Sequence, residues 1–151
     1  MFNARPMNSR EVKHVHLALK EQFGYDGLLS FHFFINRNNY IYVVNKEIAE
    51  LGLSAFKVSS VGLYFAEETG KGLRLSIEGS QLIGPYCKKK VVELSKEDAR
   101  LWLKGQNIAC QYAGSGYVLV KHDTDFLGSG YLKEGIIQNF VAKTRRIKAS
   151  D

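Results

Sequence analysis

The sequence is poor in the residues that mark unusual classes of protein. Its 151 residues include two prolines, two cysteines and one tryptophan, which excludes collagen-like, disulfide-rich and intrinsically disordered chains. With 45% hydrophobic and 24% charged residues, the chain has enough apolar side chains to build a core. We therefore expect a folded, soluble protein with one domain or with two very small ones.

The two cysteines, Cys87 and Cys110, are too far apart in the sequence for a CxxC pair and too few for a disulfide framework. We expect both to be free, buried thiols. Three lysines follow Cys87, and such cations can lower the pKa of a thiol and make it reactive. A buried structural thiol is the alternative that we favour for Cys87.

Long apolar runs are also absent. The longest candidates, residues 28–35 and 40–44, have the length of strands, well short of the roughly 18 apolar residues that a transmembrane helix needs. The first six residues are not followed by the apolar segment of a secretory signal. We therefore expect no membrane span and a cytoplasmic location.

The motifs of common enzyme classes are missing. There is no Walker loop, no dinucleotide-binding fingerprint and no zinc-ligand spacing. Two Gly-Ser-Gly triplets, at residues 114–116 and 128–130, are followed by predicted strands rather than helices, so we predict hairpin turns there and not phosphate-binding loops.

The histidines do not indicate chemistry either. His14 and His16 lie two residues apart on a predicted helix, so their side chains diverge and cannot share a metal ion. His32 and the pair His122-Asp123 have no nucleophile at a recognisable spacing. We predict no catalytic residue, no metal and no cofactor, and hence that the chain is not an enzyme.

Positive charge is in excess and lies in the second half. The net charge is +6. Residues 1–85 hold nine Lys or Arg against eight Asp or Glu, whereas residues 86–151 hold twelve against seven. Cations cluster at residues 88–90 and 143–148. Such clusters favour a polyanionic partner, most often nucleic acid, although a merely solvated surface has the same appearance.

Hydrophobic spacing predicts an α+β fold with a mixed α/β first half. The predicted elements there are a helix at residues 10–23 capped by Ser9, strands at 29–35 and 40–44, a short helix from Asn45 to Leu51, an extended segment at 57–67 and a short helix from Ser76 to Gly84. Proline disfavours helical geometry in the preceding residue, so we place a boundary at Pro85. The predicted domains are residues 1–85 and 86–151.

The second half reads as short strands with one inserted helix, the pattern of a small, partly closed β-barrel. The helix covers residues 96–103, with Ser95 as its cap and Gly105 as its left-handed end. The predicted strands are residues 88–94, 106–112, 116–122, 126–133, 136–141 and 144–148.

The helical segment 95–105, followed by the strand at 116–120, is similar to the PUA domain, a small pseudo-barrel found on RNA-modifying enzymes. The same two-part layout is similar to the Nip-type ribosome-biogenesis factors. Both likenesses imply a pseudo-β-barrel that binds RNA, and by analogy an archaeal source.

The last part of the chain resembles more specifically the PUA-like tail of the Fmu/RsmF class of ribosomal RNA cytosine-5 methyltransferases. That tail typically reads Leu-Gly-x-Gly and then Asn-x-x-Pro-Lys-x-x-Arg. The chain keeps Asn139, Lys143 and Arg146 and has Ala142 in place of the proline. The resemblance covers about residues 57–148. The catalytic domain of that class has no counterpart here, which implies an accessory module without catalytic residues.

The charge clusters and this resemblance together predict a non-catalytic RNA-binding protein that acts in ribosome biogenesis or in the modification of rRNA or tRNA. Aromatic residues interleave the basic region; we expect most of them to belong to the core and at most one or two to contact RNA. The residues predicted to contact RNA are Lys88, Lys89, Lys90, Lys104, Gly105, Lys133, Asn139, Lys143, Arg145, Arg146 and Lys148.

A second hypothesis is a recruiting subunit for a separate RNA-modifying enzyme or a pre-ribosomal protein. The first half is nearly neutral and rich in aromatic residues, and its side chains exceed what a small core is expected to hide. These residues are Phe31, Phe33, Phe34, Tyr40 and Tyr42. A docking surface in the first half would then carry the function.

Overall fold

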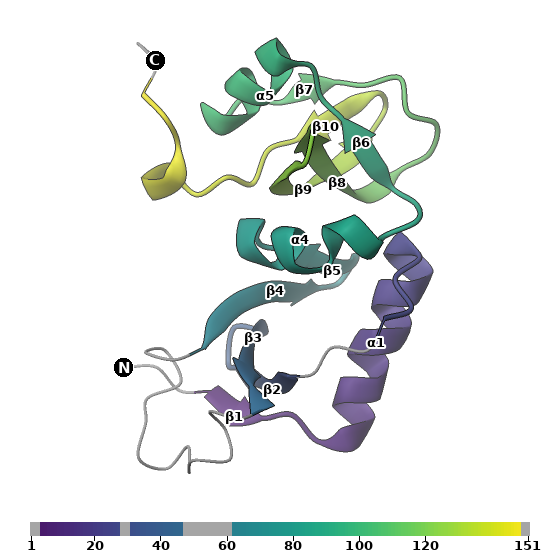
Figure 1. Cartoon of the computed structure of the whole chain (residues 1–151), viewed down its shortest axis with the longest axis vertical. Helices are drawn as coiled ribbons and strands as arrows, with labels where there is room; N and C mark the ends of the chain where they lie inside the picture. Colours follow the sequence, from purple (N-terminus) through teal and green to yellow (C-terminus); the bar gives the residue numbers. More distant parts are fainter. Residues whose placement is uncertain (1–3, 28–30, 47–61, 149–151) are drawn as a thin grey trace.

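The computed structural model describes residues 4–27, 31–46 and 62–148. They form two five-stranded sheets with the short helix α4 (Ile77–Ile83) between them (Figure 1). The fold is α+β, as the sequence predicts, and its second sheet curls into a half-barrel. No helix in the described ranges is long and apolar enough to cross a membrane.

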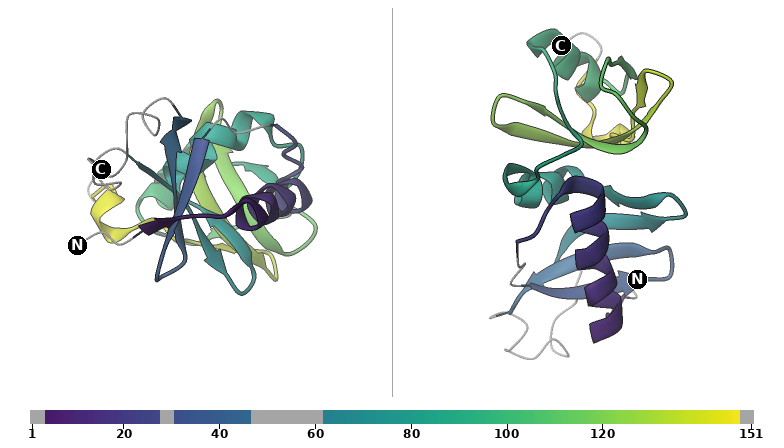
Figure 2. Two further views of the ribbon diagram at one scale, coloured as in Figure 1. Left: turned by 90° about the horizontal axis from the view of Figure 1, so that it is seen from below. Right: turned by 90° about the vertical axis from the view of Figure 1, so that its right-hand side faces the viewer.

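The first sheet is antiparallel and follows the order of the chain, β1-β2-β3-β4-β5. Its strands are β1 (Ala4–Pro6), β2 (Phe31–Asn36), β3 (Tyr40–Asn45), β4 (Leu63–Thr69) and β5 (Gly72–Leu75). Helix α1 (Ser9–Phe23) runs along one face of this sheet (Figure 2, right). The predicted first helix and the predicted strands at 29–35 and 40–44 are therefore confirmed, and the two strands pair as a hairpin.

The cap of α1 is Asn8 and not Ser9, so that detail of the prediction is wrong. The Asn8 side chain accepts a hydrogen bond from the backbone N–H of Glu11 at 2.9 Å, and the Glu11 carboxylate accepts from the Asn8 N–H at 2.9 Å. This reciprocal pair satisfies two amides of the first turn. Arg5 lies 2.7 Å from the same carboxylate and, with the Asn8 bond, lowers the pKa of Glu11 to about 2.

The second sheet has the order β6-β8-β9-β10-β7, and its pairs are antiparallel except for β6 with β8. Its strands are β6 (Val91–Glu93), β7 (Ile108–Ala109), β8 (Gly116–His122), β9 (Asp125–Lys133) and β10 (Ile136–Gln138). Helix α5 (Lys96–Leu103) has the predicted bounds. Ser95 accepts from the Asp98 N–H at 3.0 Å, and Gly105 has a φ of 93°, which favours glycine.

The two halves share packing through α4. Tyr117, Leu119 and Phe126 from the second half lie in the same apolar core as α1 and the first sheet. Two buried serines add hydrogen bonds between the halves. Ser129 donates to the Leu75 carbonyl at 2.8 Å, and Ser80 accepts from the Gly128 N–H at 3.0 Å. A domain boundary at Pro85 stays a prediction, but the core continues across that residue.

Two further predictions are wrong. Residues 144–148 do not form a strand, because the tail turns through a short 3-10 helix, η3 (Lys143–Arg145), and is held at the end of α5 by a bond from the Ile147 N–H to the Leu103 carbonyl. Gly128 and Gly130 lie within β9, not in a turn. A Cβ on Gly130 would lie 2.7 Å from the Trp102 ring, so close packing requires this glycine.

The predicted strands 88–94, 106–112 and 136–141 are shorter in the structure, at Val91–Glu93, Ile108–Ala109 and Ile136–Gln138. The predicted short helix from Ser76 to Gly84 agrees with the structure. Ser76 caps α4, and the helix continues as the 3-10 turn η2 (Gly84–Tyr86), which contains Pro85. The predicted helix from Asn45 to Leu51 lies largely outside the described residues, as does the first part of the extended segment 57–67.

Both cysteines are free and half-buried. Burial raises the pKa of the Cys87 thiol to about 12, and its sulfur lies 3.4 Å from the Ile83 carbonyl. The neighbouring lysines therefore do not activate Cys87, which agrees with the structural role that we favoured.

A variant with Cys110→Ser, which leaves Cys87 as the single thiol, is expected to react slowly with a disulfide reagent at about pH 8. Only the thiolate attacks, and a pKa of about 12 leaves far less thiolate than the ordinary value of about 8.5, so the native rate should be at least about 100-fold below the rate in denaturant. Stopped-flow absorbance measures both rates. Rates within about tenfold of each other would contradict the assigned burial.

Candidate nucleic-acid interface

The end of α5 and the tail of the chain are joined by Asn139. Its amide nitrogen donates to the carbonyls of Trp102 at 2.7 Å and Gln106 at 2.9 Å, and its amide oxygen accepts from the Val141 N–H at 2.7 Å. The Trp102 carbonyl also accepts from the Gly105 N–H at 2.9 Å, so these bonds add to the backbone cap of α5 and tie the tail to it. Both amide hydrogens are used inside the protein, so Asn139 positions the tail. An RNA contact by Asn139 stays a prediction.

Arg146 and Gly105 also lie at this corner of the molecule, where the tail meets the end of α5. The Arg146 Nε donates to the Val141 carbonyl at 3.0 Å. A Cβ on Gly105 would collide with that Nε, so the guanidinium packs directly over the glycine backbone. Gly105 thus has two reasons to be glycine, the positive φ and the close approach of Arg146. The structure brings these two predicted residues together.

Cations surround this corner. Lys143, Arg145, Arg146 and Lys148 are exposed, and Lys104 is half-buried. Arg145 forms an ion pair of 2.6 Å with Glu78 of α4. Within the described ranges, no hydrogen bond or ion pair engages the amino groups of Lys143 and Lys148. We call Lys104, Lys143, Arg145, Arg146 and Lys148 the tail cluster.

The lysines at 88–90 lie elsewhere. Lys88 forms an ion pair of 3.2 Å with Asp26, after the end of α1, and the Lys90 amino group donates to the Ser115 carbonyl at 2.7 Å. The chain between α4 and β6 passes on the right in Figure 1, whereas the yellow tail lies on the left, and Figure 2 (left) also separates the tail from α1. We call Lys88, Lys89 and Lys90 the loop cluster.

Lys133 belongs to the side of the loop cluster. It is exposed at the end of β9, directly after Leu132, which pairs with Gly116. Gly116 in turn follows Ser115, the partner of the Lys90 amino group. The predicted RNA-contacting residues therefore form two separate basic regions rather than one surface.

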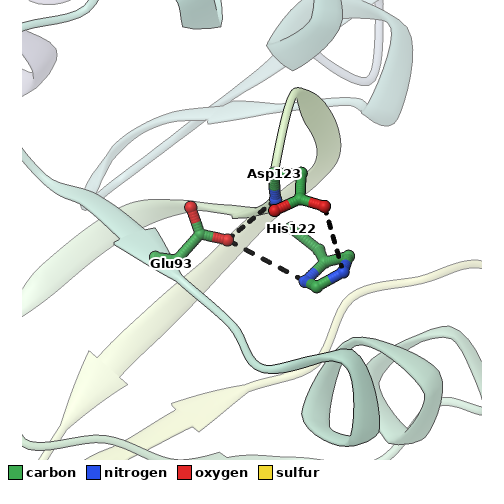
Figure 3. Close-up of side chains that lie close together, drawn as sticks. All are labelled: Glu93, His122 and Asp123. Atoms are coloured by element: carbon green, nitrogen blue, oxygen red, sulfur yellow. Dashed lines mark hydrogen bonds and ion pairs between the residues drawn. The ribbon is translucent and has the colours of Figure 1, made fainter.

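A third cluster contains Glu93, His122 and Asp123, whose ligand atoms lie within 4.8 Å of one another (Figure 3). The His122 Nδ1 lies 2.9 Å from the Leu94 carbonyl oxygen, which can only accept, so this nitrogen carries the proton. Glu93 lies 3.9 Å from Nδ1, whereas Asp123 lies 3.6 Å from Nε2. The two carboxylates face opposite nitrogens, and we assign no ion to the cluster.

Comparison with known proteins identifies the second half. Residues 89–147 match the family described as the methyltransferase RsmF PUA domain. Residues 89–147 are a PUA-like domain related to the C-terminal region of RsmF. The chain is also 32% identical over 85 residues to the ribosomal RNA small subunit methyltransferase F of Vibrio atlanticus, which covers 56% of this chain and 18% of that protein.

The protein of the same name from Aeromonas hydrophila is 38% identical over 71 residues, which covers 46% of this chain and 15% of that protein. The chain thus spans less than a fifth of the length of either relative. The matched family describes a PUA domain and not a catalytic domain. Both relatives are bacterial, so they do not support the archaeal source implied by analogy.

The PUA-like domain contains most of the predicted residues, with Lys88 and Lys148 just outside the matched range. Its motif residues Asn139 and Arg146 hold the corner between α5 and the tail. Ala142, which replaces the usual proline, lies immediately before η3. Asn139 and Arg146 of the motif therefore hold the tail at the end of α5, in the conformation that exposes the cations of the tail cluster.

Sequence reasoning missed Tyr64 and Arg74, which the fold brings to the tail of the PUA-like domain. The Arg74 guanidinium lies 4.5 Å from the centre of the Phe140 ring, and Tyr64 lies 5.3 Å from Tyr40, ring centre to ring centre. In the structure, Tyr40 and Tyr42 alternate with the buried Ile41, so the two tyrosines lie on the face of β3 opposite to Ile41. No local signal indicated that a tail 66 residues away from Arg74 would pack there, because that contact is purely tertiary.

Proposed function

We propose that this chain is a non-catalytic RNA-binding protein that acts in the modification of ribosomal RNA or in ribosome biogenesis, in the cytoplasm, and that it binds RNA through the tail cluster. The observation that carries the proposal is the group of exposed cations around the end of α5, within a PUA-like domain related to that of RsmF. Lysine and arginine side chains at such a site neutralise backbone phosphates.

The names of the relatives guide the choice of the RNA to test. Both are named as methyltransferases of the ribosomal RNA of the small subunit, so a ribosomal RNA fragment is the first ligand to test and a transfer RNA the second. We prefer the tail cluster over the loop cluster because the amino groups of two of its lysines, Lys143 and Lys148, have no hydrogen bond or ion pair within the described ranges. In the loop cluster, Lys88 pairs with Asp26 and Lys90 donates to the Ser115 carbonyl.

The proposal is tested by fluorescence anisotropy of a labelled ribosomal RNA fragment. A double variant, Lys143→Ala with Lys148→Ala, should bind at least about 10-fold more weakly, because each lysine that contacts a phosphate releases counterions on binding. The matched control is Lys13→Ala with Lys20→Ala, which removes the same charge from exposed positions of α1. Equal losses in both variants would show that only net charge matters and would overturn the assigned surface.

The recruiting role has lost its main structural argument. Phe33 and Phe34 are 3% and 4% exposed, so these two aromatic side chains belong to the interior and not to a docking surface. Phe31, Tyr40 and Tyr42 are half-buried. An RNA-modifying enzyme as partner stays a prediction, and recovery of a specific protein with the tagged chain from a native extract would test it.

A further inference from the structure

A groove lies between the first sheet and the tail of the PUA-like domain. Its volume is about 270 Å³, and β3, β4, β5, the start of α4, β9 and the tail supply its walls. Pockets for drug-sized ligands usually measure about 300–1,000 Å³. This groove is therefore suited to a ligand of the size of one aromatic heterocycle rather than to an extended molecule.

Two walls of the groove present flat π surfaces. Tyr40 and Tyr64 lie against each other with ring centres 5.3 Å apart, and Phe140 carries the Arg74 guanidinium at 4.5 Å. Phe140 is nevertheless 38% exposed, so part of the ring is accessible to solvent. Accessible aromatic rings beside an arginine are the surfaces on which proteins stack unpaired bases.

The charges inside the groove are balanced. Arg74 forms an ion pair of 2.6 Å with Glu67, and Arg145 forms one of 2.6 Å with Glu78. Burial also raises the pKa of Tyr64 to about 12, so its phenol is uncharged at neutral pH. The interior thus suits an uncharged ring, while Lys143, which follows Ala142 of the groove wall in the sequence and is exposed, suits a phosphate.

We propose that the groove holds one unpaired base of the bound RNA, beside the Tyr40 and Tyr64 rings and stacked on the exposed part of Phe140, while the tail cluster binds the flanking phosphates. This assignment rests on the proposed RNA binding. It adds that the chain selects single-stranded RNA over paired RNA. A base within a duplex is stacked on both faces and paired at its edge, so it cannot enter. The chain therefore prefers single-stranded RNA to a duplex of the same sequence.

The test uses a short single-stranded RNA that carries one 2-aminopurine, and its fully paired duplex, with the whole chain. Stacking on an aromatic ring quenches this fluorophore, so wild-type protein should quench the single strand and bind it more tightly than the duplex. Phe140→Leu should remove the quenching and weaken single-strand binding about 5- to 150-fold. Phe140→Tyr keeps the ring and should retain both.

Tyr86→Leu is the matched control, since Tyr86 is 66% exposed in η2 and does not line the groove. If Phe140→Leu lowers the melting temperature, Tyr40→Leu on the other wall is measured in its place. Binding without quenching, or equal affinities of wild type and Phe140→Leu, would overturn the groove and leave the tail cluster standing. Absence of binding to either RNA would overturn the proposed function itself, and the groove with it.

Discussion

Replacing Trp102 with alanine is expected to lower the free energy of unfolding by about 3–5 kcal/mol, the largest stability effect in the PUA-like domain. Trp102 is fully buried in the second core, and its indole N–H donates to the Leu127 carbonyl at 2.9 Å. The truncation leaves a cavity and an unpaired buried carbonyl. Since domains are stable by about 5–15 kcal/mol, the loss is a large part of the total.

Denaturant unfolding followed by circular dichroism measures this loss, because the variant no longer contains the tryptophan that would report by fluorescence. Tyr86→Ala is the control, because an exposed aromatic away from the core should change stability by no more than about 0.5 kcal/mol. A loss below about 1 kcal/mol for Trp102→Ala would mean that the second core does not pack as described.

Raising the salt concentration from about 50 mM to about 200 mM is expected to weaken RNA binding about 100-fold. The five cations of the tail cluster would neutralise about five phosphates, and for single strands the logarithm of affinity falls with the logarithm of salt with a slope of about −0.7 per phosphate. Lys143→Ala with Lys148→Ala should make this slope shallower by about 1.4.

Anisotropy titrations at four salt concentrations give the slopes of the wild type and of the double variant. The control is again Lys13→Ala with Lys20→Ala, whose slope should equal that of the wild type because these lysines lie on α1. A wild-type affinity that does not change with salt would exclude phosphate contacts as the basis of binding.

The local elements were predictable because their signals are local. Ser95 and Gly105 delimit α5 by capping geometry, and the bounds of this helix agree with the structure. The aromatic and β-branched residues of 29–35 and 40–44 likewise predicted the strands β2 and β3. The cap of α1 was placed one residue late, since both Asn8 and Ser9 are good capping residues and only the contact with Glu11 separates them.

The arrangement of the candidate site was not predictable, because it depends on contacts between distant segments. Arg146 packs over Gly105, and Arg145 reaches Glu78 of the first half. The apolar and β-branched content around Ile147 favoured a strand, but the carbonyl of Leu103 at the end of α5 holds this residue instead. The separation of the loop cluster from the tail cluster follows from the same tertiary packing.

The most direct test of the central claim is a nuclear magnetic resonance titration of the ¹⁵N-labelled chain with a single-stranded ribosomal RNA fragment. RNA binding through the tail cluster predicts shifts of the amide signals of Gly105 and of residues 143–148, while the signals of residues 88–90 stay in place. Shifts confined to residues 88–90, or no shifts at all, would contradict the assignment of the RNA-binding surface to the end of α5.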